Sequence, residues 1–281
     1  MLMKRAALIG GVVLVLAIAA AAIMFRPTGG TAVDKADAVD SFRKSQKSQN
    51  SASSDAATSA QSGSQRKDDV SKEVGVPPAG VYTYLATGES EMKLGPLPAE
   101  NRVLPSEIVV GVTDAKSTAS AGDESGVAER CFTLQLNLFV EHVEVTQYCG
   151  PGDSLRIDQH DKTLKIGPVT ANASLGCEPK ILIAVGSPVD KRACKLKLSG
   201  GPIGVEANFE GSTEIGEQTQ LEVAGKSIDV LPVTVSYIAS GSVTGTWNER
   251  FWMATDNWLP VRIERDVALV GPATITEKSE L

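Results

Sequence analysis

The stretch 203–210, IGVEANFE, alternates apolar side chains with glycine or polar side chains at every second position. A β-strand places successive side chains on opposite faces, so this alternation is typical of a strand that is buried on one face only. The stretches 231–237 (LPVTVSY) and 259–266 (LPVRIERD) repeat the pattern. One-faced strands of this kind belong to antiparallel sheets. Residues 76–281 are therefore predicted to form a mainly β domain.

The apolar face of the predicted sheet needs a cover, and residues 78–281 contain no convincing helical segment to supply one. A sheet without such a cover has to close on itself. We therefore expect a curved antiparallel sheet that forms a half-barrel, a barrel or a sandwich, with a cavity wherever the closure is incomplete.

Three polar stretches are predicted to connect strands. Residues 88–101 and 114–129 are long segments of polar residues, glycine or proline, and we expect both to be exposed loops. The pair Asp161-Lys162 is expected to be a turn between two short strands, 155–159 and 164–166.

The N-terminal segment has the length and composition of a transmembrane helix. Lys4 and Arg5 precede residues 6–25, which carry no charged side chain, and Arg26 ends the run. At about 1.5 Å per residue in a helix, this run spans the roughly 30 Å hydrocarbon layer of a bilayer. A cleaved secretory signal peptide is the alternative, because the small residues at 19–22 resemble a cleavage site. We expect an uncleaved anchor that attaches the chain to the membrane.

The cysteines indicate on which side of the membrane the domain lies. Basic residues flank the apolar run on both sides, so the positive-inside rule does not decide the orientation. All four cysteines lie in the β-rich part of the chain, and their even number suits disulfide bonds in an oxidising compartment. We expect a single-pass protein of the cell membrane, with residues 1–5 in the cytoplasm and residues 76–281 outside it. Nearest-neighbour bridges are expected, Cys131 with Cys149 and Cys177 with Cys194.

Residues 26–75 are predicted to link the anchor to the domain. Residues 31–46 space their apolar side chains in a loosely helical pattern, which predicts a short juxtamembrane helix. Residues 45–72 are rich in Ser, Ala and Gln and poor in apolar residues, so they offer too little apolar surface to offset their chain entropy. We expect them to form a disordered tether.

The register of the first predicted disulfide hairpin contains a conflict. Pairing Cys131 directly with Cys149 places Leu136 opposite Glu144 rather than opposite Val143. A β-bulge between the cysteines and the tip of the hairpin would match the apolar residues, and we expect one.

Charge and motifs exclude several classes of function. Residues 76–281 hold 17 of the 27 basic and 27 of the 34 acidic residues, and this acidic balance argues against binding of nucleic acid. No CxxC spacing occurs and the two histidines are isolated in the sequence, so we expect neither a metal nor another cofactor. Asp158 and His160 are two residues apart, which would place them on one face of a strand and suit a catalytic pair. A solvated strand face is the simpler interpretation, and we expect no enzymatic activity.

The aromatic residues near the C-terminus suggest where a ligand would lie. Trp247, Phe251 and Met253 share one face of a predicted strand, with Trp252 on the other face. We expect this face to be a packed edge of the core, and the alternative is the rim of a hydrophobic pocket. Arg265 interrupts the apolar alternation, so either a bulge intervenes or a charge points inward. The residues expected in the core or in the candidate apolar pocket are Val233, Val235, Trp247, Phe251, Val261 and Ile263.

Two stretches resemble known exported proteins. The stretches GVYTYLATGE (80–89) and FWMATDNWLPVRIERD (251–266) resemble parts of uncharacterised actinobacterial proteins that have a one-helix anchor, a tether and a cysteine-bearing β domain. The second stretch also resembles the end of the half-barrel sheet of the LolA, LppX and LprG envelope lipoproteins. That resemblance implies a concave sheet that carries lipid. The chain lacks the lipid-modified cysteine and the cavity-lining helices of those carriers.

These patterns predict a membrane-anchored envelope protein whose exported β domain binds a partner protein, a cell-wall component or a hydrophobic ligand without catalysis. One alternative is a carrier of lipid or of another hydrophobic ligand. A second alternative is an enzyme without a recognisable motif. A filled core would favour the interaction domain, and a long apolar cavity would favour the carrier.

Overall fold

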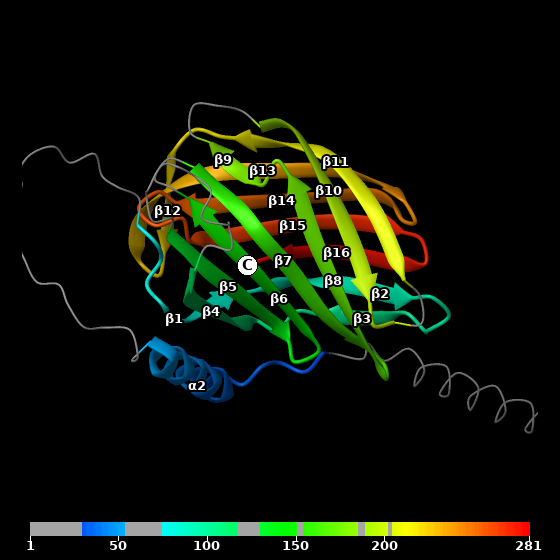
Figure 1. The fold of residues 1–281 in the computed structure, drawn as a ribbon, viewed down its shortest axis with the longest axis horizontal. Helices are drawn as coiled ribbons and strands as arrows, with labels where there is room; N and C mark the ends of the chain where they lie inside the picture. Colours follow the sequence, from blue (N-terminus) through cyan, green and yellow to red (C-terminus); the bar gives the residue numbers. More distant parts are fainter. Residues whose placement is uncertain (1–29, 54–74, 117–129, 151–153, 185–188, 202–203) are drawn as a thin grey trace, which may run out of the picture.

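The computed structural model describes residues 30–53, 75–116, 130–150, 154–184, 189–201 and 204–281. It consists of one helix, α2 (Lys35–Ser53), and one antiparallel sheet that curls on itself into a half-barrel (Figure 1). The mainly β class and the curved antiparallel sheet are therefore confirmed. The strands are β1 (Gly80–Leu85), β2 (Thr87–Leu94), β3 (Glu100–Val103), β4 (Glu107–Lys116), β5 (Arg130–Phe139), β6 (His142–Gly150), β7 (Ser154–Ile166), β8 (Val169–Glu178), β9 (Ile181–Ala184), β10 (Val189–Ser199), β11 (Val205–Ile215), β12 (Thr219–Val223), β13 (Lys226–Gly241), β14 (Thr244–Ala254), β15 (Pro260–Val270) and β16 (Ala273–Glu280).

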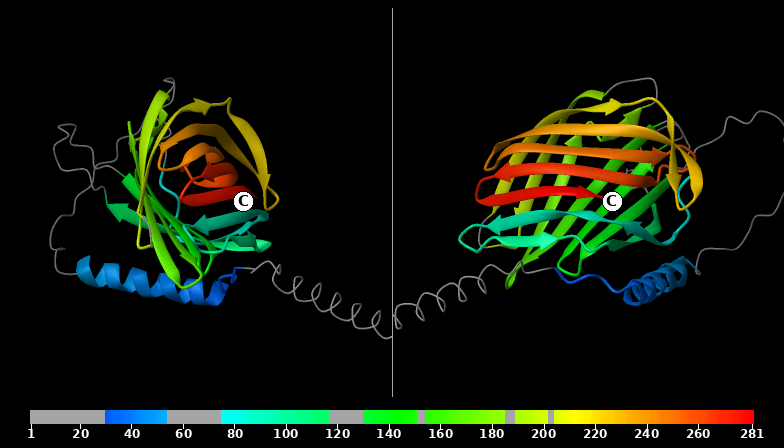
Figure 2. Two further views of the ribbon diagram at one scale, coloured as in Figure 1. Left: turned by 90° about the vertical axis from the view of Figure 1, so that its right-hand side faces the viewer. Right: turned by 180° about the vertical axis from the view of Figure 1, so that it is seen from behind.

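The sheet forms two facing walls around a shared core. Its strand order is β1-β4-β5-β6-β7-β8-β10-β11-β13-β14-β15-β16-β2-β3, with β9 beside β7 and β12 beside β13. We call β1, β4–β8 and β10 the first wall, and β11, β13–β16, β2 and β3 the second wall. The two walls cross at an angle and curve around each other (Figure 2). Neighbours in the sheet are mostly neighbours in the chain, so most of the sheet is a meander of hairpins.

The two ends of this strand order are brought together by the chain itself. β1 and β2 lie at or near opposite ends of the order, yet only Ala86 separates them. The Ala86 N–H donates to the Ser106 carbonyl (2.9 Å) and the Tyr84 hydroxyl donates to the Pro260 carbonyl (2.5 Å). On the other side, Arg102 of β3 donates from Nη2 to the Lys165 carbonyl of β7 (2.5 Å). These contacts hold the curled sheet closed around its interior.

The interior is packed mainly with aliphatic side chains, together with a few aromatic ones. Phe209 meets Trp247 edge to face, with ring centroids 5.8 Å apart. Five of the six residues assigned to the candidate apolar pocket are buried in this core, and the sixth, Val261, is half-buried and packs against it. A register shift between β14 and β15 at Trp252 and Met253 skips Val261, which explains its different position.

Some predicted connections are strands. Residues 88–101, expected to be a loop, contain most of β2 and the first residues of β3. Asp161-Lys162, expected to be a turn, lies inside the continuous strand β7. Both predictions were wrong because polar residues in these strands face solvent or a polar part of the interior. Of the second expected loop, residues 114–116 belong to β4, and 117–129 lie outside the described residues.

Both predicted disulfides are present. Cys131 bonds to Cys149, and Cys177 bonds to Cys194. A register shift does lie between the first cysteine pair and the hairpin tip, but it does not match the apolar residues as expected, because Leu136 pairs directly with Glu144. The register shifts only beyond Asn137, next to the tip. Direct pairing is tolerated because Glu144 has charged partners inside the barrel.

The helix α2 occupies the region of the predicted juxtamembrane helix and extends through residues 45–53, which had been assigned to the tether. Asp34 caps its first turn, because its Oδ1 accepts from the Ala36 N–H at 2.7 Å. Within the described ranges, no helix has both the length and the apolar character needed to cross a bilayer. Residues 1–5, the predicted transmembrane segment 6–25 and residues 54–72 of the predicted tether lie outside those ranges.

Candidate functional site

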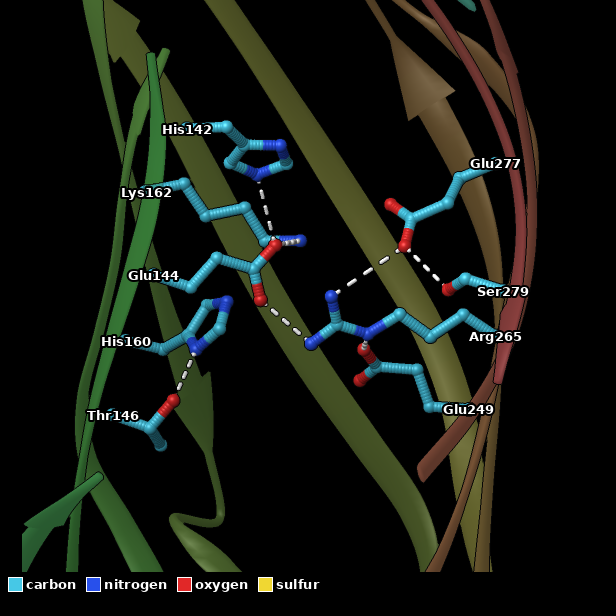
Figure 3. Close-up of polar contacts among 9 residues, drawn as sticks. All are labelled: His142, Glu144, Thr146, His160, Lys162, Glu249, Arg265, Glu277 and Ser279. Carbon is cyan, nitrogen blue, oxygen red and sulfur yellow. Dashed lines mark hydrogen bonds and ion pairs between the residues drawn. The ribbon is translucent and has the colours of Figure 1, made fainter. Parts of the chain in front are cut away.

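A cluster of buried charged side chains lies between the two walls (Figure 3). Its centre is Arg265 on β15, whose Nη2 lies 2.6 Å from Glu144 Oε2 on β6. The two side chains are 3% and 1% exposed. This ion pair therefore crosses the core from the second wall to the first.

Further groups surround both members of this pair. On the first wall, Lys162 Nζ lies 2.8 Å and His142 Nε2 lies 3.1 Å from Glu144 Oε1. On the second wall, Arg265 Nε lies 2.8 Å from Glu249 Oε1, an ion pair without hydrogen-bond geometry.

A third carboxylate completes the surroundings of the guanidinium. Arg265 Nη1 lies 3.5 Å from Glu277 Oε1, which also accepts from the Ser279 hydroxyl at 2.7 Å. Arg265 thus contacts three carboxylates, and Glu144 contacts two cationic groups and a histidine.

Strand alternation places these groups in the interior. Ile263, Arg265 and Val267 occupy successive inward positions of β15, and all three are buried. Of the two explanations offered for Arg265, the inward charge is the one observed. His142, Glu144 and Thr146 occupy the inward positions of β6 in the same way.

The ionisation of the cluster follows from its contacts. Burial alone raises the pKa of the Glu144 carboxyl, but Arg265, Lys162 and the hydrogen bond with His142 outweigh it and hold that pKa well below its usual range. The pKa of Glu277 is likewise lowered, because Arg265 and Lys162 outweigh the effect of its burial. For Arg265, burial favours the neutral form, but Glu144, Glu249 and Glu277 raise its pKa well above its usual value. Glu144, Glu277 and Arg265 are therefore charged in the folded protein.

His160 lies beside the cluster and points inward. Its Nδ1 is 2.8 Å from the Thr146 hydroxyl, and burial together with the nearby Lys162 lowers its pKa to about 3. Asp158 is skipped by a register shift in β7, and its carboxylate accepts from Arg156 Nε at 2.7 Å. The solvated strand face predicted for this pair was wrong, because the shift separates the two residues and each is enclosed by partners.

The interior leaves little room around these groups. One cavity of about 50 Å³ adjoins Lys162, Trp247 and Glu277, and a second of about 40 Å³ adjoins Arg265, Trp247 and Glu249. Cavities that bind small molecules are usually about 300–1,000 Å³. The cluster contains groups suited to acid–base chemistry, but neither cavity admits a substrate. Within the part of the chain that the structure describes, no group of three or more His, Cys, Asp or Glu side chains is placed to hold a metal ion.

A much larger hollow lies on the outer face of the second wall. This groove has a volume of about 620 Å³ and crosses strands β13–β16, β2 and β3. Strand pairing arranges its outward side chains in two rows. One row is Asn248, Asp266, Lys278, Glu89 and Val103, and the other is Thr234, Arg250, Glu264, Glu280 and Thr87.

The groove is polar and carries charges of both signs. The two rows contain four acidic and two basic side chains. Beside the groove, Arg262 bridges Glu264 and Glu280 at 2.6 and 2.9 Å. The guanidinium groups of Arg250 and Arg262 each lie 4.6 Å from the centre of the Trp252 ring. The indole and both arginines hold one another in position along this margin.

The residues of the candidate apolar pocket do not form a ligand-sized site. Val235, Trp247, Phe251 and Ile263 border the cavity of about 40 Å³, whereas Val233 is fully buried in the core. Sequence reasoning missed both the charge cluster and the groove. The signal for the cluster was Arg265 within an apolar alternation, whereas no local pattern marks the groove.

Comparison with protein-family models, with curated proteins and with solved structures found no match for this chain.

Proposed function

We propose that this protein is a single-pass membrane protein of the cell envelope whose extracytoplasmic β domain is a non-catalytic binding domain. Its ligand is a polar component of the envelope, and it binds in the groove on the outer face of the second wall. The observation that carries this proposal is the contrast between a filled core and a large outer groove. The interior cavities measure about 50 and 40 Å³, whereas the groove measures about 620 Å³.

The side chains of the groove indicate the chemistry of the ligand. Asp266, Lys278 and Glu89 stand side by side on three neighbouring strands, so charges alternate across the sheet. A ligand that matches this row carries charged groups of both signs along an extended polar chain. The peptide-bearing glycans of a cell wall have this character, and a purely hydrophobic ligand does not.

The cysteines and the anchor sequence support the proposed location of the domain outside the cytoplasm and attached to the membrane. Both disulfides join neighbouring strands of the domain, and disulfides persist in oxidising compartments. Residues 6–25 supply the apolar run that would attach the domain to the membrane. The acidic balance of the domain continues to argue against nucleic acid as a partner.

The proposal is tested by co-sedimentation with protein-free cell-wall material from the source organism. Asp266→Lys and Lys278→Glu each reverse one exposed charge of the groove without disturbing the core. We expect each reversal to weaken binding about tenfold, which corresponds to about 1.4 kcal/mol for a close charge contact at an interface.

The matched control is Glu222→Lys, which reverses an exposed charge on β12, outside the groove. Equal sedimentation of the groove variants and this control would contradict the assignment of the groove. Extraction of the purified protein provides a second measurement, because a stoichiometric co-purifying lipid would favour the carrier instead.

A further inference from the structure

The chain that follows the predicted anchor is fixed to the β domain at Thr31. The Thr31 N–H donates to Glu141 Oε2 at 3.0 Å, and its hydroxyl donates to Glu141 Oε1 at 2.8 Å. The Thr31 carbonyl accepts from the Val140 N–H at 2.8 Å. Val140 and Glu141 form the tip of the β5–β6 hairpin, so three hydrogen bonds attach the N-terminal segment to this tip.

The residue before Thr31 reinforces the attachment. A Cβ atom at Gly30 would lie 2.2 Å from Cδ1 of Phe139, whose side chain is buried in the core. Only glycine allows the backbone to pack so closely against this ring. The Glu141 carboxylate is stabilised by Thr31, whose hydrogen bonds outweigh the effect of partial burial and lower the Glu141 pKa.

The helix α2 then continues along the outside of the first wall. It packs on β1 and β4 (Figure 2). Val33 and Phe42 border a gap of about 300 Å³ together with Val81 and Val109 of these strands. The described residues before the domain are therefore docked on it, and the predicted juxtamembrane helix lies against the first wall.

The distance between anchor and domain is consequently short. The predicted transmembrane run ends at Phe25, and five peptide steps reach Gly30, a span of at most about 18 Å when fully extended. A flexible chain over the whole of residues 26–75 would have a root-mean-square length of about 40 Å. The docked arrangement therefore leaves the hairpin tip within reach of the lipid headgroups, which occupy the outer few ångströms of the bilayer.

The tip has the character of a surface that faces headgroups. Val140 is 59% exposed at its end. The Lys165 N–H of the neighbouring strand donates to the Glu141 carbonyl at 2.7 Å, so the exposed Lys165 lies beside the tip. An apolar side chain next to a lysine suits the boundary between anionic headgroups and water.

From these contacts we infer that the tip of the β5–β6 hairpin rests on the bilayer and holds the β domain in one orientation above the membrane. The inference depends on the proposed anchor at residues 6–25. Its partner is a lipid surface, and its contact residues are Val140 and Lys165.

The test measures how far single labelled positions are shielded by lipid. All four cysteines are consumed by the two disulfides, so an introduced cysteine is the sole reactive thiol. Full-length protein with Val140→Cys is labelled with an environment-sensitive fluorophore and reconstituted into vesicles of phosphatidylcholine and phosphatidylglycerol. The control is Ile181→Cys. Ile181 is 39% exposed and pairs with Arg156, which lies at the opposite end of β7 from Lys165.

We expect the label at position 140 to shift to shorter wavelength, to lose most of its quenching by aqueous iodide, and to be quenched by nitroxide-bearing lipid. The label at position 181 should keep its iodide quenching. Adding Glu141→Ala, which removes both side-chain contacts with Thr31, should restore iodide quenching at 140, whereas Glu222→Ala should not.

Extraction with alkaline carbonate separates the two proposals. A chain that resists extraction but shows equal iodide quenching at 140 and 181 would overturn the fixed orientation and leave the anchor standing. A chain released by carbonate would overturn the anchor, and the orientation with it.

Discussion

Replacing Arg265 with Met tests whether the buried charges hold the two walls together. The substitution keeps a long side chain but removes the cation that lies 2.6, 2.8 and 3.5 Å from three carboxylates. Glu144 retains Lys162, whereas Glu249 and Glu277 lose the cation that they contact. Removing one partner of a buried ion pair usually costs about 3–5 kcal/mol, because uncompensated charge remains in the interior. We expect a loss of this size in the free energy of unfolding.

A double-mutant cycle separates the ion pair from its surroundings. Glu144→Gln leaves Arg265 with two carboxylates, so we expect a smaller loss of about 2–3 kcal/mol. The double variant should lose less than the sum of the single losses, since each substitution removes the charge that the other leaves unpaired. The control is Lys195→Met, an exposed residue of β10, whose effect should stay within about 0.5 kcal/mol.

Urea unfolding followed by tryptophan fluorescence measures these losses. The Lys162 ammonium lies 4.5 Å from the centre of the buried Trp247 ring, so one of the three tryptophans that contribute to the emission adjoins the cluster. A loss below about 1 kcal/mol for Arg265→Met, similar to the control, would refute the reasoning that the cluster is a structural link between the walls.

Three further substitutions test other parts of the structure. The pKa of His160 is about 3 in the folded protein and about 6.5 in the unfolded chain, so between these values only the unfolded chain binds the proton. The contribution of neutral His160 to the free energy of unfolding is therefore complete above pH 6.5 and falls by about 1.4 kcal/mol per pH unit toward pH 3. Urea titrations at pH 7, 6, 5 and 4 should therefore show a flatter dependence for His160→Gln, and equal slopes would count against the buried neutral histidine. Replacing both Cys177 and Cys194 with Ala opens a loop with a sequence separation of 17 and should cost about 3 kcal/mol in thermal or urea unfolding. Ala173→Val extends into the cavity of about 50 Å³ and should be neutral or stabilise by up to about 1 kcal/mol, whereas Ala207→Val, in a packed part of the core, should destabilise by about 1–3 kcal/mol in the same assay.

Strands with large apolar inward side chains could be predicted from the sequence, and strands with small or polar inward side chains could not. The strands β11, β13 and β15 place large apolar residues inward, and their alternation was readable from the sequence. In β8 the inward residues include Ala171 and Ala173, and in β16 they include Glu277 and Ser279. Small or polar inward residues give no contrast between the two faces, so these two strands were missed.

The charge cluster could be anticipated only in part. Arg265 was recognised as an exception within β15, but its partner Glu144 lies 121 positions away in the sequence. The apolar pattern alone favoured an offset in the β5–β6 register that would have turned Glu144 outward. This expectation was wrong because the Arg265 cation compensates the charge of the buried Glu144 carboxylate. The groove was not predictable, since its two rows arise from the register of strands whose order a single sequence does not reveal.

The position of the cluster bears on the carrier alternative. Lys162 and Glu277 border the cavity of about 50 Å³, and Arg265 and Glu249 border the one of about 40 Å³. Joining and widening these cavities to the roughly 300 Å³ of a small ligand site would require the two walls to separate. Separation would break the ion pair of Arg265 with Glu144, so that Glu144 would keep only Lys162 and His142 of the first wall, and Arg265 only the carboxylates of the second wall. The ion pairs therefore oppose the opening that an internal lipid would need, and binding in the outer groove requires no such opening.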